Sequence, residues 1–142
     1  MSRRLQVAID CADPHRLNAF WAELLDYEIE HHDALVRRMI DAGHATLDDA
    51  VEFDGELWWK SAAACRASDG SGRLLFQVVP EPKTVKDRIH LDIHTDAEAG
   101  EDRDTVVARC IERGATKLWD GQLGPQTWVT LADPEGNEFC IS

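Results

Sequence analysis

The stretch "RIHLDIHTD", residues 88–96, alternates apolar and polar side chains without a break. In a β-strand, successive side chains point to opposite faces, so this pattern predicts a strand with two different faces. One parity is aliphatic, and the other carries two imidazoles and a carboxylate: Ile89, Leu91 and Ile93, then His90, Asp92 and His94. The polar face is either solvated sheet surface or the wall of a site that binds metal or moves protons.

Length and charge limit the class of protein. The chain has 142 residues, which suits a single domain spanning residues 1–142, or two small halves fused around a shared core, with enough length to bury a hydrophobic interior. Its 27 acidic and 15 basic residues give a formal net charge of −12. Nucleic acids and anionic membranes need a basic surface, so this balance excludes them as partners and favours a small-molecule ligand.

Cysteine spacing and hydropathy indicate the compartment. The four cysteines show no C-x-x-C spacing, and "MSRRLQVAID" has too short an apolar run for a signal peptide. No apolar stretch approaches the roughly 18 residues of a membrane span. We therefore expect a reduced, cytoplasmic protein.

The order of predicted elements occurs twice. In the first half, "LQVAID" (5–10) reads as a strand, and a helix follows with Asp13 as N-cap and Pro14 at its first position. The strand "YEIE" comes next. In the second half, the strand at 88–96 precedes a helix from about Asp102 to Arg113, which Gly114 ends, and the strand "ATKLW".

Matching the two first strands shifts the numbering by 84 and places Gln6 opposite His90. Each half also ends with a D-x-x-G turn and a short strand, in "SDGSGRLLFQVV" (68–79) and "ADPEGNEFCIS" (132–142). This is the pattern of an internal duplication. Residues 33–43 predict an extra helix, with Asp33 as a possible N-cap, that has no counterpart in the second half.

The stretches "DCADPHRLNAFWAELLDYE", "LLFQVVPEPKTVKDRIHLDIH", "RGATKL" and "DPEGNEFCI" together make the chain resemble the vicinal oxygen chelate superfamily. This superfamily contains glyoxalase I, extradiol dioxygenases and bleomycin-resistance proteins, and the chain is most similar to its glyoxalase-like domain branch. The resemblance implies an α+β fold of two βαβββ modules, about 1–82 and 83–142, whose curved sheets form a cavity with helices outside. It also implies a homodimer.

In metal-using members, ligands come from the first and last strands of each module. The resemblance places these positions at Gln6, Gln77, His90 and Cys140, with Glu138 one strand pleat before the usual glutamate. The predicted metal ligands are Gln6, Gln77, His90 and Glu138, and the divalent ion would be Zn, Ni, Mn or Fe. Two neutral amides and one displaced carboxylate make a weak set, so a cavity without metal stays the alternative.

Other roles for the same residues stay open. His90, Asp92 and His94 could form a proton relay in which Asp92 orients the two imidazoles, although a satisfied polar cluster would look the same. The candidate catalytic residues are His90, Asp92 and Glu138. Cys140 is reactive only if a positive neighbour lowers its pKa. The candidate ligand-binding residues are aromatic, imidazole or thiol side chains: Trp58, Trp59, Trp128, His94 and Cys140.

Two other groups receive a predicted role. Trp21 and Trp119 are assigned to core packing, and Lys83, Lys86 and Arg88 either hold an anionic group at a cavity mouth or pair with surface acids. The expected function is binding of a small organic molecule, with metal-dependent lyase, isomerase or dioxygenase chemistry as one version. A binder of bleomycin-resistance type, which sequesters a drug or metabolite without catalysis, is the alternative.

Overall fold

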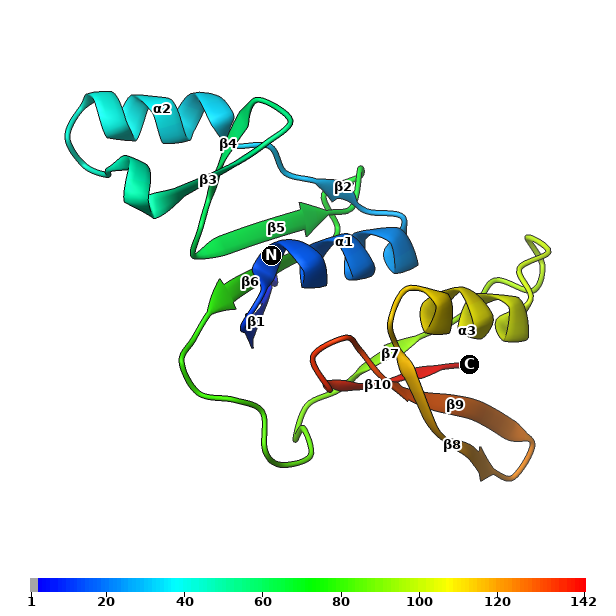
Figure 1. The fold of residues 1–142 in the computed structure, drawn as a ribbon. Helices are drawn as coiled ribbons and strands as arrows, with labels where there is room; N and C mark the ends of the chain where they lie inside the picture. The colour runs from blue at the N-terminus through cyan, green and yellow to red at the C-terminus, as the bar shows by residue number, and fades with distance from the viewer. Residues whose placement is uncertain (1–2) are drawn as a thin grey trace. The chain divides into compact units, whose positions relative to one another are not determined.

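The computed structural model describes residues 3–142 and contains two compact units, one ending at Pro80 and one beginning at Glu81 (Figure 1). Each unit has a four-stranded mixed sheet with the same strand connectivity. The order is β1-β6-β5-β2 in the first unit and β7-β10-β9-β8 in the second. The α+β class and the repeated βαβββ order predicted from the sequence are therefore confirmed, whereas a single domain spanning both units stays a prediction.

The first unit packs one helix on its sheet. Its shared elements are β1 (Val7–Cys11), α1 (Pro14–Leu25), β2 (Glu28–Ile29), β5 (Ala62–Arg66) and β6 (Arg73–Val78). Asp13 caps α1 by accepting a hydrogen bond from the Arg16 N–H, and Pro14 is the first helical residue, as predicted. α1 lies against β5 and β6, where Leu17 and Trp21 are buried.

The first unit also carries an insertion that has no counterpart in the second. It consists of α2 (Asp33–Asp41), the short helix η1 (Leu47–Asp49) and the hairpin of β3 (Ala50–Phe53) and β4 (Glu56–Trp59). Val36, on the apolar side of α2, is fully buried against Ala50 and Leu57 of the hairpin. The insertion therefore covers its own apolar face. Asp33 is the first helical residue, whereas the N-cap position belongs to His32.

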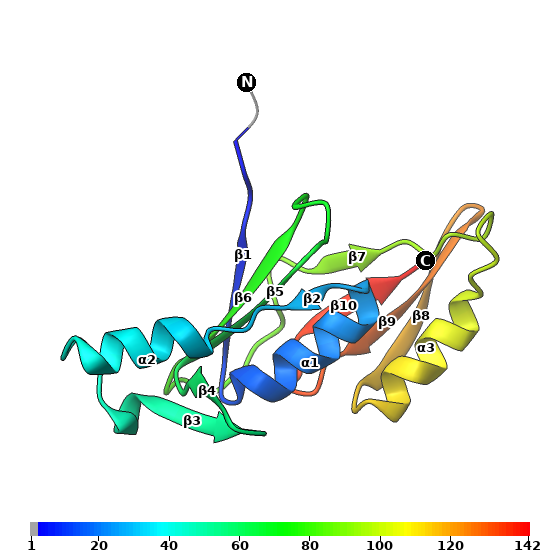
Figure 2. The same cartoon turned by 90° about the horizontal axis from the view of Figure 1, so that it is seen from above.

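The second unit repeats the shared elements without an insertion: β7 (Leu91–Ile93), α3 (Arg103–Glu112), β8 (Thr116–Leu123), β9 (Gln126–Ala132) and β10 (Glu138–Ile141). Asp102 caps α3 through the Thr105 N–H. Figure 2 shows the long β8–β9 hairpin with α3 beside it. Leu131, Phe139 and Ile141 are almost completely buried on the inner face of the sheet.

Two details of the second unit differ from prediction. The strand expected at 88–96 is limited to Leu91–Ile93, because β10 pairs with β7 only from Phe139 to Ile141. Ile89, placed by the alternation on the aliphatic face of that strand, instead precedes the strand and is 84% exposed. Trp119 was expected in the core, but it is 48 % exposed, because an irregularity in the β8–β9 pairing between Lys117 and Trp119 interrupts the strand alternation.

No helix within residues 3–142 is both long enough and apolar enough to cross a membrane.

Candidate functional site

A cavity of about 530 Å³ lies on one face of the second sheet. All of the residues that line it belong to the unit that begins at Glu81. They combine aromatic, imidazole, hydroxyl, thiol and charged groups: Lys86, His90, Asp92, His94, Trp119, Gln126, Thr127, Trp128, Thr130, Glu138, Phe139, Cys140 and Ser142. His90, Asp92 and His94, the polar parity of the opening stretch, are all among them.

Strand register explains why these side chains converge. Asp92 of β7 pairs with Cys140 of β10, Cys140 pairs with Thr130 of β9, and Thr130 pairs with Trp119 of β8. Paired residues in adjacent strands point to the same face of a sheet. One row across four strands therefore presents a carboxylate, a thiol, a hydroxyl and an indole to the cavity.

His90 joins this row from the residue before β7. Its Nδ1 lies 2.9 Å from Oδ1 of Asp92. His90, Asp92 and Cys140 each place one potential ligand atom within 4.8 Å of the others. The Cys140 Sγ lies 3.4 Å from Oγ1 of Thr130. An imidazole, a carboxylate and a thiol suit Zn²⁺ or a similar borderline ion, so these residues fit a metal after small side-chain movements.

Glu138 has a different environment. Its carboxylate accepts hydrogen bonds from Nζ of Lys83 at 3.2 Å and from the backbone N–H of Asp87 at 3.0 Å. In return, the Glu138 N–H donates to Oδ2 of Asp87 at 3.2 Å. Both Glu138 oxygens are thus engaged in tying the loop before β7 to the start of β10.

The pKa of Glu138 reflects these contacts. Desolvation would raise it, but hydrogen bonding within the Asp87–Glu138 pair and the bond and charge of Lys83 outweigh desolvation and hold the pKa at about 2. Desolvation raises the pKa of Asp87, and the neighbouring Glu138 charge adds to that rise. These contacts favour the charged form of Glu138 and join it to Lys83 and Asp87, while its role in proton transfer stays a prediction.

The predicted ligands Gln6 and Gln77 belong to the first unit. Gln6 Oε1 accepts a hydrogen bond from Nη1 of Arg73. Arg73 also donates to both carboxylate oxygens of Glu30, at 2.8 and 2.7 Å. The hydrogen bond from Arg73 lowers the pKa of Glu30. Gln77 lies on β6, opposite Asp10 of β1. The amide oxygen that would ligate a metal at Gln6 is thus occupied by a guanidinium.

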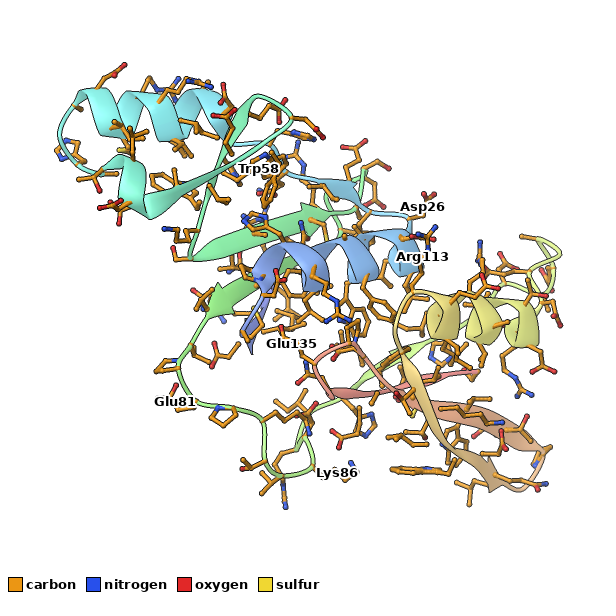
Figure 3. The ribbon with its side chains drawn as sticks, viewed as in Figure 1. Asp26, Trp58, Glu81, Lys86, Arg113 and Glu135 are labelled. Atoms are coloured by element: carbon orange, nitrogen blue, oxygen red, sulfur yellow. The ribbon has the colours of Figure 1, made fainter. Side chains whose placement is uncertain are left out.

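Trp58 and Trp59, predicted to contact ligand, lie in β4 of the insertion and do not line the cavity of the second unit. Trp58, which Figure 3 labels, is flanked by two histidine rings. The ring centroids of His31 and His15 lie 4.8 and 5.8 Å from that of Trp58. Its Nε1 is buried without a hydrogen-bond partner in the described part of the chain. Trp58 therefore packs the β3–β4 hairpin against His15 of α1 and against His31 within the first unit.

Trp119 and Lys86 also line the cavity. The sequence had predicted Trp119 in the core and had left two possible roles open for Lys86. The position of Trp119 at the cavity could have been predicted only by detecting the β-bulge, for which the sequence carries no clear signal. His94, which was predicted, lies 2.7 Å from Oγ of Ser142 through its Nδ1.

The four cysteines remain thiols. Cys140 is half-buried at the cavity, whereas Cys11, Cys65 and Cys110 are buried elsewhere. Burial raises the pKa of Cys65 to about 11, so this thiol stays protonated at neutral pH.

The family model described as a glyoxalase-like domain matches residues 6–142 of this chain. No curated protein sequence gives a significant match. Among solved structures, a glyoxalase/bleomycin resistance protein/dioxygenase family enzyme from Burkholderia phytofirmans PsJN is 16% identical, with a TM-score of 0.62, covering 96% of this chain and 94% of that one. A glyoxalase family protein from Bacillus cereus is 15% identical, with a TM-score of 0.59 and coverage of 99% and 93%.

A mutant of the fosfomycin resistance protein FosX from Listeria monocytogenes, complexed with Mn(II) and 1S,2S-dihydroxypropylphosphonic acid, is 10% identical. Its TM-score is 0.63, and the match covers 99% of this chain and 89% of that one. Identities this low show a shared fold and leave the ligand of this chain to be argued from its own residues.

Proposed function

This chain belongs to the glyoxalase-like domain family, and on that premise we propose that it binds a small organic molecule in the cavity of its second unit. The observation that carries the proposal is the cavity itself. Its volume of about 530 Å³ lies within the range of small-molecule sites, roughly 300–1,000 Å³. Two indoles and several convergent polar groups line it, which is the usual composition of such a site.

Ligand-observed NMR with a mixture of small organic fragments tests this proposal. Fragments that bind should lose binding in Trp128→Ala, which removes a cavity wall, and should keep it in Trp58→Phe, whose change lies in the first unit. Equal binding to both variants would place the fragments elsewhere and refute the proposal.

A second candidate function is metal-dependent chemistry, favoured by the grouping of His90, Asp92 and Cys140. These residues, rather than the predicted set of Gln6, Gln77, His90 and Glu138, are the ones we propose as ligands. A bound divalent ion would act as a Lewis acid on a substrate oxygen. Lyase, isomerase or dioxygenase activity would require this metal site. Sequestration of a ligand without catalysis would not.

Metal analysis after incubation with Zn²⁺, Ni²⁺, Mn²⁺ or Fe²⁺ and desalting separates the two versions. Wild type and Gln6→Ala should hold stoichiometric metal, whereas His90→Ala and Cys140→Ser should lose it. Wild-type protein without metal would refute the metal site and leave the binder. The homodimer also stays a proposal, which sedimentation equilibrium would test.

A further inference from the structure

One end of the cavity is an aromatic wall built from two adjacent strands. Gly121 of β8 pairs directly with Trp128 of β9, and Trp119, two residues before Gly121, pairs with Thr130. Trp119 and Trp128 are thus diagonal neighbours on the cavity face of the sheet, within reach of each other's large side chains. Both line the cavity.

Gly121 allows this wall to be flat. A Cβ atom at position 121 would lie 2.1 Å from Cε2 and 2.2 Å from Nε1 of Trp128, closer than any two such atoms can approach. The indole of Trp128 therefore rests directly on the backbone of β8, beside Trp119. Any residue larger than glycine would therefore force this indole away from β8.

The charges around the cavity are balanced unequally. Lys83 is shared by the carboxylates of Glu138 and Asp87, and Asp92 is hydrogen-bonded to His90. Lys86, on the loop leading into β7 (Figure 3), has only the carbonyl oxygen of Asp87 within hydrogen-bond distance, at 3.4 Å. Within residues 3–142, no carboxylate forms an ion pair with Lys86. Lys86 thus offers the cavity a positive charge that, within the described residues, is not held in an ion pair.

From these two features we infer that the cavity takes a planar aromatic anion, whose ring lies against Trp128 and Trp119 and whose anionic group is held by Lys86. The inference rests on the proposed function, because it names the class of molecule that the same cavity binds. Indoles favour flat aromatic partners over saturated ones of equal size, and a cation selects for negative charge. The two selections act at separate residues and can be tested separately.

Three probes of matched size test the inference: 2-naphthoate, its uncharged analogue 2-naphthamide, and its saturated analogue decahydro-2-naphthoate. Calorimetry should give a Kd for 2-naphthoate about fivefold lower than for either analogue, as expected for one partly exposed charge contact and for one aromatic stacking contact. In ¹H–¹⁵N spectra, 2-naphthoate should shift the indole N–H signals of Trp119 and Trp128 and leave that of Trp21 unchanged.

Variants assign each preference to its residue. Lys86→Met keeps the aliphatic stem and should abolish the preference for naphthoate over naphthamide, whereas Lys60→Met in the first unit should preserve it. Gly121→Ala should abolish the preference for the aromatic over the saturated anion. Circular dichroism of each variant verifies that the fold is intact.

The outcomes separate this inference from the proposed function. Equal affinity for naphthoate and naphthamide, or a charge preference that survives in Lys86→Met, would overturn the anionic part. Equal affinity for the saturated analogue would overturn the aromatic part. Failure of all three probes, while fragments still bind in a Trp128-dependent manner, would overturn this inference alone. If no fragment bound in a Trp128-dependent manner either, the proposed function would be overturned as well.

Discussion

Replacing Glu138 with glutamine separates a structural role for this carboxylate from the ligand role predicted for it. In the structure, Glu138 joins Lys83 and the Asp87 N–H to the start of β10, and its side chain is only 14% exposed. Glutamine has nearly the same shape but cannot carry the charge. Glu138→Gln should therefore destabilise the protein even when no metal or ligand is present.

The expected size follows from the pKa. Lowering it from 4.5 to about 2 corresponds to about 3–4 kcal/mol, at about 1.4 kcal/mol for each pKa unit. Solvent screening reduces this value, and removing the Glu138 charge also relieves Asp87, whose pKa that charge helps to raise. We therefore expect Glu138→Gln to lower the free energy of unfolding by about 1–2 kcal/mol at pH 7.

The sign of the pH dependence is fixed by the direction of this change. The folded-state pKa is lowered, so the stabilisation is fully present above pH 4.5 and is lost as the pH falls through about 2. The difference between wild type and Glu138→Gln should thus be constant from pH 6 to 8. It should shrink to less than about half by pH 3.

Urea unfolding followed by circular dichroism at a series of pH values measures this difference. Glu98→Gln is the matched control, because it removes one exposed acid that has no hydrogen bond or ion pair with another residue of 3–142. It should leave the free energy of unfolding within about 0.5 kcal/mol of wild type. Equal stability of wild type and Glu138→Gln at pH 7, or a difference that persists unchanged at pH 3, would refute the structural role.

Three further predictions concern the first unit and the cavity thiol. Trp58→Ala should lower the free energy of unfolding by about 3 kcal/mol. Trp58→Phe should lower it by less than about 1 kcal/mol, because phenylalanine fills much of the same space and removes a buried N–H that has no partner among the described residues. Urea unfolding of both variants measures the contrast. Arg73→Met should lower the free energy of unfolding by about 2 kcal/mol at pH 7. The loss should become smaller as the pH falls below the ordinary pKa of Glu30, because Arg73 lowers that pKa by stabilising only the charged carboxylate. Equal losses at pH 7 and pH 3 would contradict this. Iodoacetamide should modify Cys140 faster than the three buried thiols, as measured by peptide mass spectrometry. Modification of Cys140 at the same rate as the buried thiols, or more slowly, would contradict its accessibility.

Local chemistry made several elements predictable from the sequence. Asp13 and Pro14 define the start of α1 because capping depends on residues within one turn of each other. The repeated order of elements was predictable for the same reason, since strand alternation and D-x-x-G turns are local patterns.

The contacts that shape the site could not be predicted in this way. Lys83 and Glu138 are 55 residues apart in sequence, and only the folded loop brings them together. The exposure of Trp119 depends on an irregular strand pairing that alternation cannot reveal. His90, Asp92 and His94 were correctly placed on one parity, but which of them meets Cys140 depends on the register of β10.

Comparing the strand pairing of β1 with β6 and of β7 with β10 shows how the candidate site differs from the equivalent positions of the first unit. Ala8 pairs with Leu75 in the first unit as Asp92 pairs with Cys140 in the second. On the same sheet face, an alanine and a leucine thus hold the positions of the carboxylate and the thiol. Two residues before Leu75, Arg73 holds the position of Glu138.

The exchange of Glu138 for Arg73 has a chemical consequence within the first unit. A guanidinium cannot ligate a cation, and here it is held by both oxygens of Glu30 while it also binds the Gln6 oxygen. A cation could reach Gln6 only by displacing Arg73 and would then face its positive charge. The first unit has thus kept the duplicated backbone but uses the equivalent sheet positions for an ion pair. The first unit has Gln6, Ala8 and Leu75 at the positions that His90, Asp92 and Cys140 hold in the second, which is why the proposals made for this protein depend on the second unit.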